Sequence, residues 1–360
     1  MAYYHSSYGS PKKKNSKGKR IFFFFLLFLL IIAAGAGYWL YNIVLKPNVW
    51  TPNNEAATIT IPTGSDYEDV KNILYSQGLI INRQNFEWLA EKKKFPDVVK
   101  PGRYLIDSTM SNNDLINLLR SGEQLPVQLI FNNIRDIYQL AETVSEQIEA
   151  DSASIVQLLT DSTYLSLLGL QKETAPILFI PNTYEMYWNT SAEGFLKRMH
   201  EEYIKFWNGE RTRLANEIGL TIAEVVTLAS IVEKETNKND EKQIIAGVYM
   251  NRLKAGWRLQ ADPTVIYAIG DYSIKRVLNV HKEIRSPYNT YQFFGLPPGP
   301  ICIPSIASID AVLNFDRHNY LFFCAKDDMS GYHEFAKTNR QHNINARKYQ
   351  EALNKMGVYK

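Results

Sequence analysis

Two carboxylate side chains, Glu233 and Glu235, close an apolar run that the residue spacing predicts to be a deeply packed helix. At about 100° per residue, Glu233 shares the packed face with Val226 and Ala229, whereas Glu235 points well away from it. A carboxyl group on a packed face loses hydration, which raises its pKa and suits it to general-acid catalysis at neutral pH. Glu233 is therefore the first catalytic candidate, with an ion pair to a neighbouring Lys or Arg as the competing interpretation. Glu235 is the second candidate, against the simpler interpretation of a solvated charge at a helix end.

The next dense polar cluster is residues 258–264. Asp262 is a candidate second catalytic carboxylate, but an Asp before Pro263 is also typical of an N-cap followed by proline at the first helical position. Gln260 has no such explanation. Its amide suits a hydrogen bond to the acetamido group of a sugar, and a surface role is the alternative.

Aromatic and turn residues alternate in two nearby stretches, residues 286–291 and 295–300. Sugar rings stack on aromatic faces and bond to amides, so this composition is typical of a glycan-binding loop. A rigid structural loop is the alternative.

Several other kinds of site are disfavoured by the sequence. Cys302 and Cys324 lack the spacing of zinc ligands, and either a disulfide or two buried thiols fits their apolar flanks. The segment His333-Glu334-Phe335 is not HExxH, and neither a phosphate-binding glycine loop after a predicted strand nor a GxSxG elbow is found. We expect no metal and no cofactor. The net charge of +3 over 360 residues is too small to indicate nucleic acid as a partner.

A largely helical region must hold these candidates. Thr221 and Glu224 form a capping box that opens the helix carrying Glu233. The apolar spacing and low glycine content predict helices over most of residues 134–215, interrupted by a short apolar strand or loop at 177–181. Further helices are predicted over residues 240–253 and 339–355.

A small α+β module precedes this region, over residues 57–131. Its predicted strands are residues 58–61, 103–106 and 127–131, and its predicted helices are residues 66–77, capped by Ser65, 82–94 and one that runs from Ser111 to Gly122. Residues 46–56, rich in Pro and Asn, read as a linker.

The N-terminus predicts the compartment. Residues 21–45 are a nearly unbroken apolar run, and a membrane-spanning helix needs about 20 residues. The basic tail, residues 1–20, should stay cytoplasmic, which places the rest of the chain on the outer side of the cell (inner) membrane. A cleaved signal peptide is the rival, because Ala34-Gly35-Ala36 resembles a cleavage site, but the apolar stretch continues past it.

Four ordered motifs resemble the endolytic murein transglycosylases, the YceG-like family. They are the segments Leu228–Thr236, Asn251–Leu253 with Arg258–Tyr267, Tyr288–Tyr291, and Gly295–Ile301. The layout is similar as well: an N-terminal anchor, a LysM-like module, and a catalytic domain of mixed helices and strands over residues 132–360. The resemblance therefore implies an α+β fold.

The family resemblance also implies a reaction. A lone glutamate, here Glu233, protonates the β-1,4 bond between N-acetylmuramic acid and N-acetylglucosamine, and a 1,6-anhydro sugar forms without water. Cutting nascent strands in this way would limit their elongation. The candidates for substrate contact are Gln260, Asp262, Thr264, Tyr288, Asn289, Thr290, Ser230 and Glu235.

One departure from the family pattern lies in residues 176–185, where Asn182 stands in place of an Asp and a Glu-Gly pair is missing. Any role carried over to that segment is weakened. The expected partners are peptidoglycan glycan strands, the cytoplasmic membrane and peptidoglycan synthases. The alternatives in function are a noncatalytic peptidoglycan-binding scaffold and a muramidase-type hydrolase.

Overall fold

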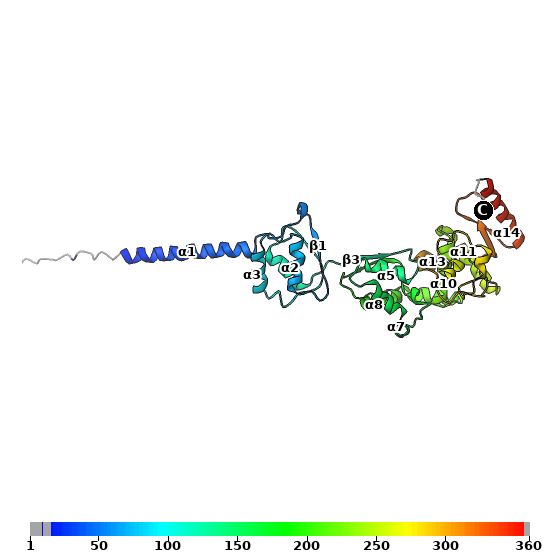
Figure 1. Ribbon diagram of the computed structural model, residues 1–360, viewed down its shortest axis with the longest axis horizontal. Helices are drawn as coiled ribbons and strands as arrows, with labels where there is room; N and C mark the ends of the chain where they lie inside the picture. Colours follow the sequence, from blue (N-terminus) through cyan, green and yellow to red (C-terminus); the bar gives the residue numbers. More distant parts are fainter. Residues whose placement is uncertain (1–8, 10–15, 356–360) are drawn as a thin grey trace, which may run out of the picture. The chain divides into compact units, whose positions relative to one another are not determined.

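The computed structural model describes residue 9 and residues 16–355. The chain divides into two compact units, Met1–Leu125 and Pro126–Lys360. The lysines at positions 12–14 of the predicted cytoplasmic tail lie outside the described residues, and the end of that tail already belongs to the first helix. The predicted α+β class is confirmed (Figure 1).

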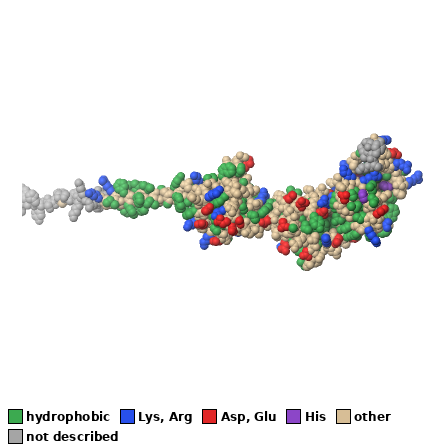
Figure 2. All heavy atoms as spheres, in the orientation of Figure 1, with side chains coloured by type: hydrophobic (Ala, Val, Ile, Leu, Met, Phe, Trp, Pro, Cys, Tyr) green, Lys and Arg blue, Asp and Glu red, His purple; other side chains and the backbone are tan. Residues whose placement is uncertain are grey.

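The first helix, α1 (Ser16–Val44), is apolar and exposed. Its 29 residues extend about 43 Å at 1.5 Å per residue, more than the roughly 30 Å of a bilayer core. Hydrophobic side chains cover most of it after the basic residues at its start (Figure 2), and its most apolar window has no buried residue. The helix is therefore long and apolar enough for a single-pass membrane anchor, in agreement with the predicted span of residues 21–45.

The end of α1 is part of the small unit's core. Ile43 is buried, and the Asn112 side chain donates a hydrogen bond to its carbonyl at 2.8 Å. Bridges join Pro47 to Ser111 and Val49 to Ile80. The predicted linker over residues 46–56 is therefore wrong at its beginning, because that segment pairs with the module.

The small unit has two helices between two antiparallel strands, followed by a third helix. Its elements are a 3₁₀ turn (Pro52–Asn54), β1 (Ala57–Ile61), α2 (Tyr67–Ser76), α3 (Arg83–Lys92), β2 (Gly102–Ile106) and α4 (Asn112–Ser121). Ile59 lies opposite Tyr104 in the register, and both side chains are buried. The cap of α2 is Asp66 rather than the predicted Ser65, because the Asp66 carboxylate accepts the Asp69 N–H.

The strand β3 (Val127–Phe131) belongs to the second unit. It pairs antiparallel with β4 (Asn182–Met186), with Leu129 opposite Tyr184. The predicted boundary of the small module at residue 131 is therefore wrong, since the division falls after Leu125. Strand β4 was not predicted, and it overlaps the end of the segment in which this chain departs from the family pattern.

Helices make up most of the second unit. Its first part contains β3, α5 (Ile137–Ser145), α6 (Ser152–Thr160), α7 (Ser162–Leu167), a 3₁₀ turn (Ala175–Leu178), β4, α8 (Ala192–Phe206) and α9 (Gly209–Ile218). Its second part contains α10 (Ile222–Glu235), α11 (Asn239–Lys254), α12 (Asp262–Ile269), a 3₁₀ turn (Asn279–Glu283), α13 (Ile306–Leu313), β5 (Phe322–Ala325), β6 (His333–Ala336) and α14 (Asn339–Lys355). The helix predicted to follow the Thr221 capping box and the helices predicted at 240–253 and 339–355 are confirmed.

Helix α10 lies at the centre of the second part. It packs against α11 and α13, which lie beside it in Figure 1, and also contacts α9 and α12. The hairpin of β5 and β6 carries α14 on its surface. Both glutamates lie in the last turn of α10, shortly before α11 begins.

Candidate active site

The helix that carries both glutamates starts and ends at well-defined residues. Thr221 and Glu224 form the predicted capping box, with the Thr221 hydroxyl accepting the Glu224 N–H at 3.2 Å. Residues 225–232 are all buried. Since two residues turn a helix by about 200°, Glu233 and Glu235 leave α10 on nearly opposite sides.

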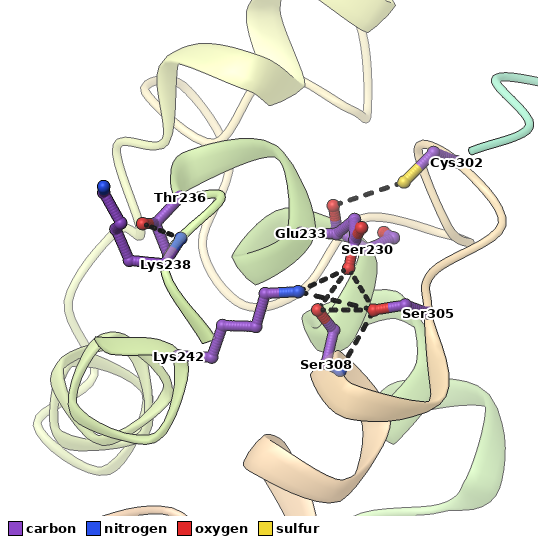
Figure 3. Close-up of polar contacts among 8 residues, drawn as sticks. All are labelled: Ser230, Glu233, Thr236, Lys238, Lys242, Cys302, Ser305 and Ser308. Atoms are coloured by element: carbon purple, nitrogen blue, oxygen red, sulfur yellow. Dashed lines mark hydrogen bonds and ion pairs between the residues drawn. The ribbon is translucent and has the colours of Figure 1, made fainter. Parts of the chain in front are cut away.

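Glu233 is one partner of an ion pair. Its carboxylate lies 3.0 Å from Lys242 Nζ, and the two side chains are 23% and 5% exposed. The hydroxyl of Ser305 donates to the same oxygen at 2.6 Å, and that of Ser308 donates to it as well (Figure 3). Three donors therefore converge on one carboxylate oxygen.

These donors determine the protonation state of Glu233. Burial alone would raise the pKa of Glu233, but the hydrogen bonds from Ser305, Ser308 and Lys242, with the charge of Lys242, hold that pKa below its ordinary value. The prediction of a raised pKa at Glu233 is therefore wrong. Desolvation on the packed face is outweighed by partners that come from α11, from α13 and from the residue that caps α13.

Glu235 lies in different surroundings. It is half-buried, and its carboxylate accepts a hydrogen bond from the Tyr249 hydroxyl at 2.5 Å. Burial raises the pKa of Glu235 to about 7, and the nearby charge of Asp262 adds to the rise. The hydrogen bond from Tyr249 and the charge of Arg252 act in the opposite direction. The prediction of a solvated charge at a helix end is therefore wrong for Glu235, and a substantial fraction of it is protonated at neutral pH.

Glu235 faces a cavity of about 380 Å³, which we call the Glu235 cavity. Its lining is mostly polar and aromatic: Glu235, Tyr249, Arg252, Gln260, Asp262, Tyr291, Phe322, Phe323, Asn339, His342 and Asn343. Cavities of this kind, a few hundred cubic ångströms with convergent polar groups and a perturbed pKa, are typical of ligand sites.

Gln260 and Asp262 are the sequence candidates that share this cavity with Glu235. Gln260 is exposed and has φ of 52°, in the left-handed region where non-glycine residues are uncommon. The carboxylate of Asp262 accepts the Tyr291 hydroxyl at 2.6 Å. The predicted N-cap role of Asp262 is wrong, because α12 begins at Asp262, with Ala261 in the cap position.

Arg252 is held beside Glu235 by backbone groups. Its Nε donates to the carbonyl of Leu321 at 2.7 Å, and its Nη1 donates to the carbonyl of Leu259. The guanidinium carbon lies 5.6 Å from the centre of the Phe322 ring. Arg252 therefore gives the cavity a fixed positive charge.

Four of the candidates for substrate contact are buried and form hydrogen bonds within the protein. Ser230, Thr264, Asn289 and Thr290 are each at most 2% exposed. Asn289 donates to the carbonyls of Lys282 and Ile284 at 2.9 and 2.8 Å. The other three bond within the protein in the same way, with Thr290 accepting the Ala261 N–H at 2.9 Å. Substrate contact by these four residues stays a prediction, and in the structure their side chains bond to neighbouring backbone and side-chain groups.

Tyr288 lies in a separate cavity of about 230 Å³, together with Tyr267. The two ring centres are 4.7 Å apart. The structure therefore does not bring Tyr288 together with Glu235, although Tyr291 of the same motif reaches the Glu235 cavity.

Sequence reasoning did not single out six of the lining residues: Tyr249, Phe322, Phe323, Asn339, His342 and Asn343. Arg252 and Tyr291 stood inside recognised motifs without an assigned role. The signal that could have found Tyr249 is its position in α11, the helix packed against α10. Within residues 16–355 and residue 9, no group of three His, Cys, Asp or Glu side chains lies close enough to hold a metal ion. Cys302 and Cys324 are unpaired thiols.

A carboxyl group with a pKa near neutrality, facing a polar cavity with amides and a fixed cation, has the properties that acid–base cleavage of a glycosidic bond requires. The sequence profile described as the YceG-like family matches residues 59–348. The chain belongs to the YceG-like family.

Relatives of known name are similar over most of the chain. An endolytic murein transglycosylase of Bacillus subtilis is 29% identical, over 88% of this chain and 91% of that protein. One of Streptococcus pneumoniae is 28% identical, over 87% of this chain and 62% of that protein. The crystal structure of a YceG-like protein from Listeria monocytogenes is 27% identical, with a TM-score of 0.53 over 81% of this chain and 99% of that one.

Proposed function

We propose that this chain is a peptidoglycan lytic transglycosylase and that Glu235 is its acid–base catalyst. The observation that carries the assignment of the residue is the pKa of Glu235, raised to about 7 in the Glu235 cavity. A general acid works best when its pKa lies near the operating pH. The names of the relatives support the reaction.

The reaction uses one carboxyl group twice. Protonated Glu235 gives its proton to the oxygen of the β-1,4 bond, and the bond from C1 of N-acetylmuramic acid to that oxygen breaks. The 6-hydroxyl of the same sugar forms a bond to C1, and its proton passes to the Glu235 carboxylate. Atoms and protons balance without water, and Glu235 ends in the state in which it began.

Neighbouring side chains tune this cycle. Tyr249 donates to Glu235 and stabilises the carboxylate that exists between the two proton transfers. The negative charge of Asp262 favours the protonated form and, near the sugar, stabilises positive charge developing at C1. Arg252 provides the opposing charge.

A muramidase-type hydrolase is the second candidate, because Asp262 places a second carboxylate in the Glu235 cavity. Glycoside hydrolases use two carboxylates around the bond they cut. The products separate the two reactions, since an anhydro end is lighter by one water than a reducing end. A noncatalytic scaffold would produce neither.

Glu233 as the catalyst stays a competing prediction, and matched variants test it. We would incubate the purified full chain, Glu235→Gln and Glu233→Gln with glycan strands and weigh the products. Glu235→Gln should reduce anhydro-end formation by about 100-fold or more. Glu233→Gln, compared per folded molecule, should retain most of it. Normal cleavage by Glu235→Gln together with inactive, folded Glu233→Gln would reverse the assignment.

For location, we propose that α1 anchors the chain in the cytoplasmic membrane with its N-terminus inside. The ring of Trp39 lies 5.1 Å from that of Trp88 on α3, and indole rings favour the membrane interface. The order β1, α2, α3, β2 supports the predicted LysM-like module. The substrate would then be membrane-proximal glycan strands, close to the peptidoglycan synthases. Cleavage of these strands would limit their length.

A further inference from the structure

The C-terminal helix forms one wall of the Glu235 cavity. Asn339, His342 and Asn343 of α14 line it, and their spacing of three and four residues places them on one face of the helix. The hairpin beneath α14 contributes Phe322 to the same wall. The cavity is therefore closed by a segment about 100 residues after Glu235 in the chain.

The imidazole of His342 has a fixed orientation. It stacks on the Phe322 ring, with centroids 5.4 Å apart and an interplanar angle of 23°. Its Nδ1 is buried and has no hydrogen-bond partner. Since His342 lines the cavity and its Nδ1 is buried, we infer that the ring edge with Nε2 is the one available to a ligand. Within the described part of the chain, no side chain or backbone group hydrogen-bonds to Nε2.

The surroundings of His342 favour its neutral form. Burial lowers the pKa of His342, and the charge of Arg252 lowers it further. A neutral imidazole carries its proton on one nitrogen. A buried N–H without an acceptor costs more than a buried lone pair, so the proton belongs on Nε2. The cavity wall thus presents an uncharged N–H donor beside an apolar ring.

We propose that His342 is a substrate-binding residue that donates a hydrogen bond from Nε2–H to the acetamido oxygen of an N-acetylated sugar, a role that rests on the proposed function. The acetyl methyl group then lies against Phe322, and the exposed amides of Asn339 and Asn343 are beside it. Arg252, which also lines the cavity, donates from Nε and Nη1 to backbone carbonyls. A de-N-acetylated sugar lacks the acceptor and brings an ammonium group to an N–H donor.

The test compares two glycans in a double-mutant cycle. We would measure kcat/KM of the full chain and of His342→Phe on N-acetylated strands and on the same strands after chemical de-N-acetylation. Phe keeps the stacking on Phe322 and removes the donor. The wild type should prefer N-acetylated strands by about tenfold or more, and His342→Phe should bring the ratio close to one, mainly through KM. His342→Gln, which retains an N–H donor, should recover part of the preference.

His200→Phe is the matched control. His200 is also half-buried and stacked on an aromatic ring, Tyr203, at 6.3 Å, but it is not part of the Glu235 cavity. In His200→Phe, the ratio of kcat/KM on N-acetylated strands to kcat/KM on de-N-acetylated strands should equal the wild-type ratio. An unchanged ratio in folded His342→Phe would overturn the role of His342.

The ratio of the Kd values for the two glycans, measured in the Glu235→Gln background, separates failure of the proposed function from failure of the role of His342. Wild-type chain that binds but does not cleave strands would contradict the proposed function. Cleavage with a ratio insensitive to His342 would contradict only the further inference. If His342→Phe does not fold, the comparison rests on His342→Gln, which should then reduce the ratio but not abolish it; a ratio equal to the wild type would count against the role.

Discussion

Removing the Tyr249 hydroxyl should change the pH at which the enzyme loses activity. Tyr249 is 1% exposed, and its hydroxyl stabilises the Glu235 carboxylate, so Tyr249→Phe should raise the pKa of Glu235 above about 7. A hydrogen bond to a charged group is worth about 1.5–3 kcal/mol, and one pKa unit corresponds to about 1.4 kcal/mol. Because Arg252 still stabilises the Glu235 carboxylate in Tyr249→Phe, we expect the pKa of Glu235 to rise by about one unit.

Asp262→Asn should have the opposite effect. The charge of Asp262 raises the pKa of Glu235, so its removal should lower that pKa. Two substitutions in one cavity therefore have opposite predicted signs, which a general loss of packing would not produce.

The assay is kcat/KM for glycan strands as a function of pH. The acid must be protonated to act, so wild-type activity should fall as the pH rises through about 7. The falling limb should move up by about one unit in Tyr249→Phe and down in Asp262→Asn. Tyr203→Phe, a half-buried tyrosine outside the cavity, is the control and should leave the limb in place. Limbs that coincide in all four proteins would refute the assignment of Glu235 as the titrating acid.

Three further predictions concern stability. The folded pKa of Glu235 exceeds its ordinary value of 4.5, so the folded chain loses stability as the pH rises from about 4.5 through 7. At pH 8, Glu235→Gln should therefore be more stable than the wild type, by up to about 3 kcal/mol. At pH 4 the two proteins should be equally stable in thermal melts. The lowered pKa of Glu233 has the opposite sign: its contribution is present above the ordinary pKa and lost as the pH falls through the folded pKa. Glu233→Gln should therefore lower the free energy of unfolding by about 3 kcal/mol at pH 7 and by less at acidic pH. Equal melting temperatures of the two proteins at pH 7 would contradict the ion pair with Lys242. Asn289→Ala should cost about 2 kcal/mol in denaturant titration, because two carbonyls lose their donor, while KM stays roughly unchanged; a large rise in KM in a stable variant would support the predicted substrate contact.

Local signals in the sequence were sufficient for most helices. The capping box at Thr221 and Glu224 and the polar helix at residues 339–355 depend on neighbours a few residues apart, which the sequence displays directly. Strand β3 was predicted in position but assigned to the wrong unit, because its partner β4 lies about 50 residues further along the chain. Pairing of strands distant in sequence leaves no local signal.

The choice between Glu233 and Glu235 shows where sequence reasoning ended. A helical wheel places the two side chains on opposite sides of α10, but residues 225–232 are buried all around the helix, so both sides are packed. Which side carries neutralising partners depends on Lys242, Ser305 and Ser308, and which side opens onto a cavity depends on segments as far away as α14.

The sequence by itself indicated the apolar N-terminal helix, most helices, the family motifs and two candidate glutamates, of which it favoured Glu233 as the catalyst. Only the tertiary structure gives the two glutamates different surroundings, on which our proposal of Glu235 rests. The pKa of a carboxyl group is controlled by burial and by the charges and donors within a few ångströms, and those neighbours come together only when the chain folds. The same glutamate type is therefore a paired anion on one side of α10 and a protonatable acid on the other.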